Sequence, residues 1–165
     1  MNTLLSTFSL LLGLTFFLTT APLAAQSGDA LPTLREMPEG TNPQRHLLQT
    51  FYEQVKFPKV AQEARRGGAY LLTITIDPSG ASTWTAVPLT ASTKPANPIN
   101  LAVVAADRTA GATVSGQMKV NADRALIEET ERMGRYLVDI GFTPAVRQGT
   151  PVADSLQLAV YYRME

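Results

Sequence analysis

The sequence predicts an α+β domain in which helices pack on one side of a small three-stranded antiparallel sheet. Residues 70–77 and 155–163 alternate apolar and polar side chains with a period of two, which is typical of half-buried strands. Residues 122–140 repeat apolar side chains at helical spacing. The apolar helix face and the apolar strand faces can each be buried by the other, so we expect them to pack together.

The first segment, residues 1–25, contains no charged residue, and its apolar centre spans residues 10–18. A short apolar run followed by small residues is typical of a signal peptide rather than of a spanning helix. We expect cleavage near Ala25 or Gln26, which would leave a periplasmic or secreted protein. Because no Lys or Arg lies near Met1, an uncleaved inner-membrane anchor stays open as the alternative.

The absence of cysteine and the zero net charge exclude several classes of site and partner. Because the chain of 165 residues contains Cys 0, it has no disulfide, no thiolate nucleophile and no Cys-ligated zinc. Its net charge of +0 creates no overall field toward nucleic acid or anionic lipid, so we expect no nucleic-acid partner. The mature length is that of one domain able to bury a core.

Two helices are expected to open the domain. Residues 26–41 are rich in Gly, Pro, Ser and acidic side chains and predict a short tether, so the domain would span 42–165. Asn42 is a candidate N-cap, and Pro43 suits the first helical position. A second helix would run from Pro58 to about Arg66 and end at Gly67 and Gly68.

A hairpin follows. The strand at residues 70–77 is expected to end in the turn Asp77-Pro78-Ser79-Gly80, which has the residue types that such turns favour. Residues 81–89 would return as an antiparallel partner that Pro88 stops. One face of the first strand would carry the apolar side chains of Tyr70, Leu72, Ile74 and Ile76.

Residues 90–120 read as an insertion with two open interpretations. Residues 101–105 and 112–120 could form an added hairpin, or the whole segment could be a loop. Asn121 would then cap a long helix that ends at Gly141. Its buried face is predicted from four residues, Leu126, Met133, Leu137 and Ile140. An extended segment at residues 142–145, a turn at Gln148-Gly149 and a last strand at 155–163 complete the chain.

Catalysis has little support in the sequence. His46 is the only histidine, and no Ser or Asp motif surrounds it as a general base would require. Neighbouring carboxylates at residues 128–131 diverge around a helix, whereas metal ligands must converge. We therefore expect no enzyme activity, no metal, no cofactor and no small-molecule substrate. A hydrolase that uses His46 is the remaining enzymatic alternative.

The order of short motifs resembles the carboxy-terminal domain of the TonB family, over roughly residues 36–163. The matching motifs are Glu36-Met37-Pro38-Glu39-Gly40, Phe57-Pro58 with Ala61 and Ala64, Gly68, Asp77-Pro78-Ser79-Gly80, Phe142-Thr143-Pro144-Ala145 and Gly149-Thr150-Pro151-Val152. The resemblance implies a periplasmic binding module that engages outer-membrane receptors. Unlike an energy-transducing TonB, this chain has a tether that reaches at most about 55 Å and lacks a Pro-rich spacer.

The resemblance also implies a binding site. In this family the last strand pairs with a short extended segment of the receptor, and the aromatic-Pro region assists. The implied partner-binding residues are Lys56, Phe57, Pro58, Leu156, Gln157, Leu158, Ala159, Val160, Tyr161, Tyr162 and Arg163. Phe57 replaces the usual Tyr and so lacks its hydroxyl. A three-stranded sheet would leave an edge whose backbone groups accept such a strand.

We therefore expect a non-enzymatic module, linked to TonB-dependent outer-membrane transport, that binds an extended segment of an outer-membrane receptor or other envelope protein. Two alternatives stay open. The protein could be a membrane-anchored short energy transducer, or a structural or assembly protein of the cell envelope. The sequence also allows a homodimer that forms through its strands.

Overall fold

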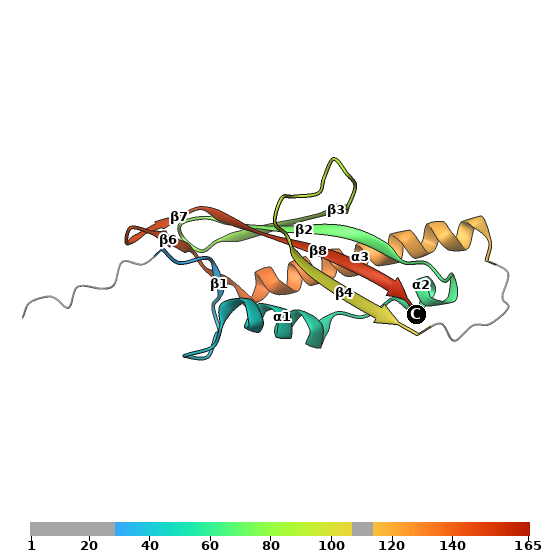
Figure 1. Cartoon of the computed structure of the whole chain (residues 1–165), viewed down its shortest axis with the longest axis horizontal. Coiled ribbons are helices and arrows are strands. Elements are labelled where there is room, and N and C mark those ends of the chain that lie inside the picture. Colours follow the sequence, from blue (N-terminus) through green and yellow to red (C-terminus); the bar gives the residue numbers. More distant parts are fainter. Residues whose placement is uncertain (1–28, 107–113) are drawn as a thin grey trace, which may run out of the picture.

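The computed structural model describes residues 29–106 and 114–165, and within them the chain is an α+β domain (Figure 1). Its main sheet has four strands in the order β3-β2-β8-β4. These are β3 (Ser82–Pro88), β2 (Gly68–Ile76), β8 (Asp154–Met164) and β4 (Ile99–Ala105). The predicted sheet of three strands is therefore wrong, because the inserted segment supplies β4 as a fourth strand beside β8.

The β2–β3 hairpin is confirmed, in antiparallel register from Tyr70 opposite Pro88 to Ile76 opposite Ser82. Asp77 organises its turn. The Asp77 carboxylate accepts hydrogen bonds from the Ser79 hydroxyl at 2.6 Å and from the backbone N–H groups of Ser79 and Ala81. Gly80 has a φ of +84°, which favours glycine at this position.

The two first helices begin as expected. The Asn42 side chain caps α1 (Pro43–Gln54) by accepting the Arg45 backbone N–H at 3.0 Å. Helix α2 (Lys59–Glu63) follows Pro58. Its exit differs from the prediction, because Arg65, with a φ of 49°, takes the left-handed conformation expected of Gly67 or Gly68. Gly67 is needed for another reason: a Cβ there would collide with the Tyr162 carbonyl oxygen.

The long helix, α3 (Gly116–Ile140), starts earlier than predicted. Ser115 rather than Asn121 is its N-cap, with the Ser115 hydroxyl accepting the Met118 backbone N–H at 3.2 Å. Residues 116–120 are helical, so a second inserted strand at residues 112–120 is wrong for this part; residues 112 and 113 lie outside the described ranges. The first turns of α3 are mostly exposed, so they lack the apolar spacing that would predict a helix there.

The core is built from side chains of the main sheet together with side chains of the helices. The predicted alternation in β2 is confirmed, because all four predicted side chains are buried. In α3, Leu126, Met133 and Leu137 are fully buried, whereas Ile140 is only partly buried. The other main members of the core are Phe51, Leu101, Phe142, Leu158, Val160 and Tyr162.

Smaller strands close one end of the domain. Strand β1 (Thr33–Leu34) pairs with β5 (Phe142–Thr143), and β6 (Ala145–Arg147) pairs with β7 (Thr150–Val152) across the predicted turn at Gln148 and Gly149. Because Leu34 is buried in the core, part of the predicted tether belongs to the folded domain.

The connection at residues 89–98 passes from β3, at one edge of the sheet, to β4 at the other (Figure 1). Leu71 and Ala159 alternate with the core residues of β2 and β8, so they point to the opposite face of the sheet, and they are nevertheless buried. The predicted leader lies outside the described residues. Among residues 29–106 and 114–165, no helix is both long and apolar enough to span a bilayer.

Candidate functional site

The last strand is not an edge of the sheet. Strand β8 pairs with β2 along Asp154–Tyr162 and with β4, in parallel, from Leu158 to Met164. The implied strand addition to β8 is therefore wrong over most of its length, because β4 already occupies that side. Of the predicted binding residues on β8, only Leu156 and Gln157 lie before the stretch that pairs with β4. Four others are buried, Leu158, Ala159, Val160 and Tyr162.

Strand β4 is held in place by its own apolar side chains. Leu101 is 1% exposed and Val103 is 8% exposed, and they lie in register with Val160 and Tyr162. Burying one such side chain stabilises a fold by about 1.5 to 3 kcal/mol. An incoming strand would have to replace both contacts and the backbone ladder, so exchange of β4 for a partner segment is unfavourable.

The predicted residues Lys56, Phe57 and Pro58 line a shallow groove between α2 and α3. The other groove residues are Lys59, Ala125, Glu128, Glu129 and Arg132. The Lys56 backbone N–H donates to Glu129 Oε1 at 2.7 Å, and the Arg132 guanidinium donates to the same oxygen at 2.7 Å. Glu129 therefore anchors the chain between α1 and α2 to the long helix.

Phe57 packs against a buried side chain of β8. Its ring packs edge-on against Tyr162, with centroids 5.7 Å apart, and the Tyr162 hydroxyl lies 3.2 Å from Thr130 Oγ1. Burial raises the pKa of Tyr162 to about 12. The two predicted site regions thus touch, but they do so inside the core and away from any open sheet edge.

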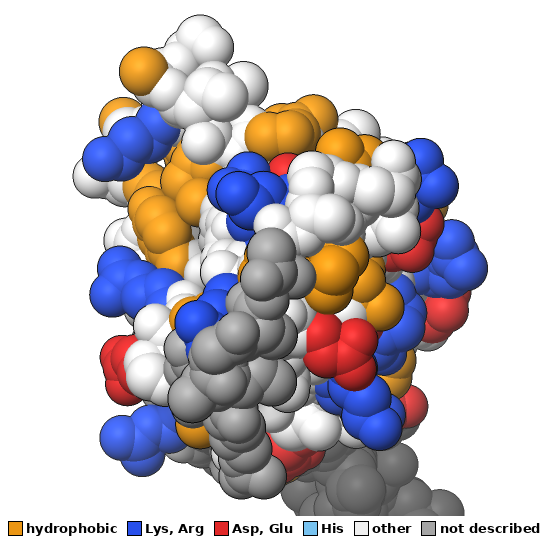
Figure 2. All heavy atoms as spheres, turned by 90° about the vertical axis from the view of Figure 1, so that its right-hand side faces the viewer, with side chains coloured by type: hydrophobic (Ala, Val, Ile, Leu, Met, Phe, Trp, Pro, Cys, Tyr) orange, Lys and Arg blue, Asp and Glu red, His pale blue; other side chains and the backbone are white. Residues whose placement is uncertain are grey.

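The end of the molecule that carries α2 bears charges of both signs on its described residues. Figure 2 shows positive, negative and hydrophobic side chains intermixed over this end. Arg66 forms an exposed ion pair with Asp123 at 2.7 Å, and the Asp123 hydrogen bond raises the pKa of the arginine.

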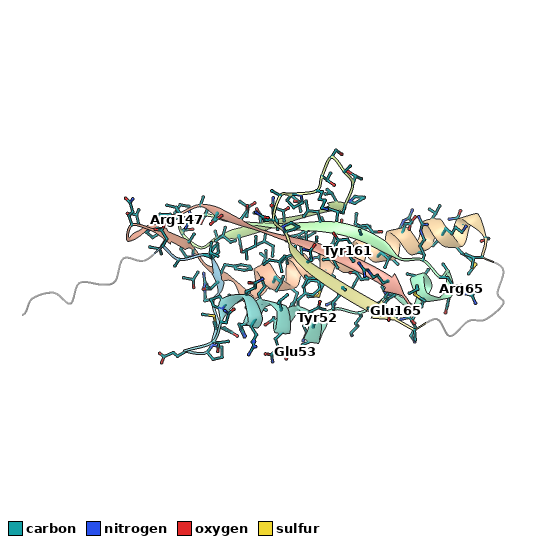
Figure 3. All side chains as sticks on the ribbon, viewed as in Figure 1. Tyr52, Glu53, Arg65, Arg147, Tyr161 and Glu165 are labelled. Atoms are coloured by element: carbon teal, nitrogen blue, oxygen red, sulfur yellow. The ribbon has the colours of Figure 1, made fainter. Side chains whose placement is uncertain are left out.

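The outer edge of β4 presents backbone groups to solvent. The Ala102 N–H donates to the Tyr52 hydroxyl of α1 at 3.1 Å, whereas the Ala105 carbonyl accepts from Glu165 on the side of β8. Because strand residues alternate between the two sides, Asn100, Ala102 and Val104 direct their backbone groups outward. Within the described residues, no strand pairs with this side. Figure 3 shows Tyr52 on α1, next to β4.

The opposite edge belongs to β3. The Leu89 N–H donates to the Ala69 carbonyl at 2.8 Å, so odd-numbered residues of β3 face β2. Ser82, Trp84 and Ala86 therefore point their backbone groups outward. The side chains of these three residues face α3, where the Trp84 ring lies over Gly134. Pro88 ends the strand and removes one donor.

An apolar pocket of about 180 Å³ adjoins the start of β4. It is lined by Leu31, Pro32, Thr33, Leu34, Pro43, Gln44, Leu47, Ile99, Phe142 and Leu156. The pocket lies where β8 extends beyond β4, so Leu156 is the only predicted binding residue that reaches it. The sequence carried the signal for β4 at residues 101–105, but nothing in it marked Tyr52 or this pocket.

The residues considered for catalysis or metal binding lie apart from these edges. His46 is partly buried on α1, and Glu129 is paired with Arg132. Among the residues that the structure describes, no three His, Asp or Glu side chains converge as a metal site would require.

Comparison of the chain with protein-family models, with curated proteins and with solved structures found no match.

Proposed function

We propose that this protein is a non-enzymatic periplasmic binding module of the TonB carboxy-terminal type, which receives an extended polypeptide along the outer edge of β4. The partner class is an outer-membrane receptor or another envelope protein. The motif order supports the family likeness, and the apolar leader supports the location. An arrangement with the helices on a single side of the sheet is part of this proposal.

One observation carries the proposal: the outward backbone groups of Asn100 and Val104 have no strand beside them in the described residues. Such a row of alternating donors and acceptors is complementary to an extended chain, which forms the next strand of the sheet. Each new backbone hydrogen bond adds about 0.5 to 1.5 kcal/mol. The apolar pocket at the start of β4 then selects among segments.

The proposal places the partner one strand further out than the family resemblance implies. Because β4 pairs in parallel with β8, it fills the place that an incoming segment would need there. The edge of the sheet moves outward with it. Phe57 and Pro58 then support the core under β8 and do not touch the partner.

The edge can be tested with single proline substitutions. Val104→Pro removes an outward N–H and leaves the ladder between β4 and β8 intact, because proline is tolerated on edge strands. Val104→Ala keeps the N–H and controls for the lost side chain. Ala86→Pro makes the same backbone change on the β3 edge.

The measurement is a titration of the ¹⁵N-labelled mature protein with peptides from the amino-terminal segments of outer-membrane receptors. We expect amide shifts at Asn100 and Val104 that vanish in Val104→Pro and persist in both controls. No amide shift with any of these peptides, or binding that survives Val104→Pro, would contradict the proposal.

The anchored alternative is separated by sequencing the amino terminus of the mature protein. An intact Met1 favours a membrane-anchored transducer, whereas a start near Ala25 or Gln26 favours the free module. The assembly alternative predicts self-association through a strand edge.

A further inference from the structure

We propose that the outer edge of β4 also pairs with β4 of a second copy of this chain, antiparallel about Ala102, and that the Tyr52 hydroxyl holds this edge closed in the monomer. The inference uses the same edge as the proposed function but does not depend on a receptor partner. It assigns to Tyr52 a role that neither the motifs nor the family likeness suggests.

The edge is complementary to itself. Its outward-facing residues, Asn100, Ala102 and Val104, are evenly spaced, so a two-fold axis at Ala102 places Asn100 of one copy opposite Val104 of the other. In an antiparallel pair, opposed residues whose backbone groups point toward the partner strand exchange both N–H···O bonds. All three outward residues of each copy therefore find backbone partners without any rearrangement of the sheet.

Strand β4 itself carries no charged side chain that would oppose this pairing. Residues 95–106 contain no Asp, Glu, Lys or Arg, and the whole chain has a net charge of +0. Natural edge strands are usually protected by charged side chains, proline or bulges, and like charges directly opposite each other destabilise a pair. The small side chain of Ala102 at the axis also leaves room for the second strand.

Tyr52 occupies the backbone donor at the centre of this edge. Its hydroxyl accepts the Ala102 N–H, which is the donor that a second copy needs at the two-fold axis. The Tyr52 side chain comes from α1 and is 47% exposed, so it can swing toward solvent when a backbone carbonyl replaces it. Pairing thus costs each copy one hydrogen bond to a tyrosine.

The replacement predicts the effect of deleting the hydroxyl. Tyr52→Phe keeps the ring and its edge-on contact with Phe51, whose centroid lies 6.1 Å away. The substitution removes the hydrogen bond from the Ala102 N–H to Tyr52, which exists only in the monomer. It therefore destabilises the monomer and leaves the dimer unchanged. Because two copies contribute, the dimer dissociation constant should fall about thirtyfold.

The test is sedimentation velocity on the mature protein over a wide range of concentration. We expect weak dimerisation of the wild type, tighter dimerisation of Tyr52→Phe, and a monomer for Val104→Pro. Ala86→Pro, on the β3 edge, should behave as the wild type. Circular dichroism verifies that each variant is folded, and Asn100→Pro repeats the block at the other end of β4.

The inference is overturned if Tyr52→Phe associates no more tightly than the wild type. It is also overturned if the single variants Val104→Pro and Asn100→Pro are both folded and both still form dimers. Its failure can be told apart from failure of the proposed function. Receptor peptides that bind β4 of a strictly monomeric protein refute only the dimer. A dimer that Tyr52→Phe strengthens, in a protein that binds no peptide, refutes only the receptor proposal.

Discussion

Gly134→Ala in α3 is expected to destabilise the domain, although alanine is the better helix former. A Cβ on Gly134 would lie 2.8 Å from Leu72 Cδ1 and 3.0 Å from Trp84 Cδ2. Leu72 is fully buried, and the Trp84 ring is rigid, so neither can yield without disturbing its own packing. The glycine therefore allows α3 to approach the β2–β3 hairpin closely.

The magnitude follows from two opposing terms. Alanine in the interior of a helix is better than glycine by about 1 kcal/mol. Forcing an extra methyl into a packed core costs about 1 to 3 kcal/mol. We expect a net loss of about 1 kcal/mol in the free energy of unfolding. Gly116→Ala, on the same helix, is the matched control, because nothing lies within 4 Å of its Cβ position.

Urea unfolding, followed by circular dichroism and by the fluorescence of the single tryptophan, measures both variants. Gly116→Ala should be neutral or slightly stabilising. Trp84→Phe combined with Gly134→Ala should recover part of the loss in a double-mutant cycle. If Gly134→Ala is as stable as Gly116→Ala, the close contact between α3 and the hairpin is refuted.

Three further predictions concern stability. Burial raises the pKa of Tyr162 to about 12, whereas a tyrosine in the unfolded chain has a pKa of about 10. The free energy of unfolding should therefore fall as pH rises between these values, and urea midpoints should show a shallower fall in Tyr162→Phe. Hydrogen bonds to the Asp77 carboxylate lower its pKa, and the one from the Ser79 hydroxyl contributes most. Asp77→Ala should thus lower the melting temperature at neutral pH and lose the decline that the wild type shows as pH falls through that pKa. Arg66→Ala, which breaks an exposed pair, should change the free energy of unfolding by less than about 1 kcal/mol.

Local signals predicted the elements that depend on neighbouring residues. The β2–β3 hairpin follows from alternation and from the Asp77–Gly80 turn, and Asn42 marks the start of α1 as a cap. These features arise from contacts between residues close together in the chain. The buried residues of α3 followed in the same way from helical spacing, as Leu126, Met133 and Leu137 show.

The edge of the sheet could not be predicted in this way. Residues 101–105 have the composition of a strand, but their pairing with Leu158–Met164 joins segments far apart in the sequence. Two strands of similar composition do not specify which lies outside. The contact of Tyr52 with Ala102 is equally non-local, and the exposed first turns of α3 lack the apolar period that would have placed its start at Gly116.

Amide hydrogen exchange of the mature protein, with and without receptor peptide, tests most directly whether β4 rather than β8 bears the open edge. The amides of Ala159 and Tyr161 should exchange slowly in both states, whereas those of Asn100 and Val104 should exchange rapidly when free and slowly when the peptide is bound. Rapid exchange at Ala159 and Tyr161 in the free protein, slowed by the peptide, would show that β8 is the edge and contradict the account.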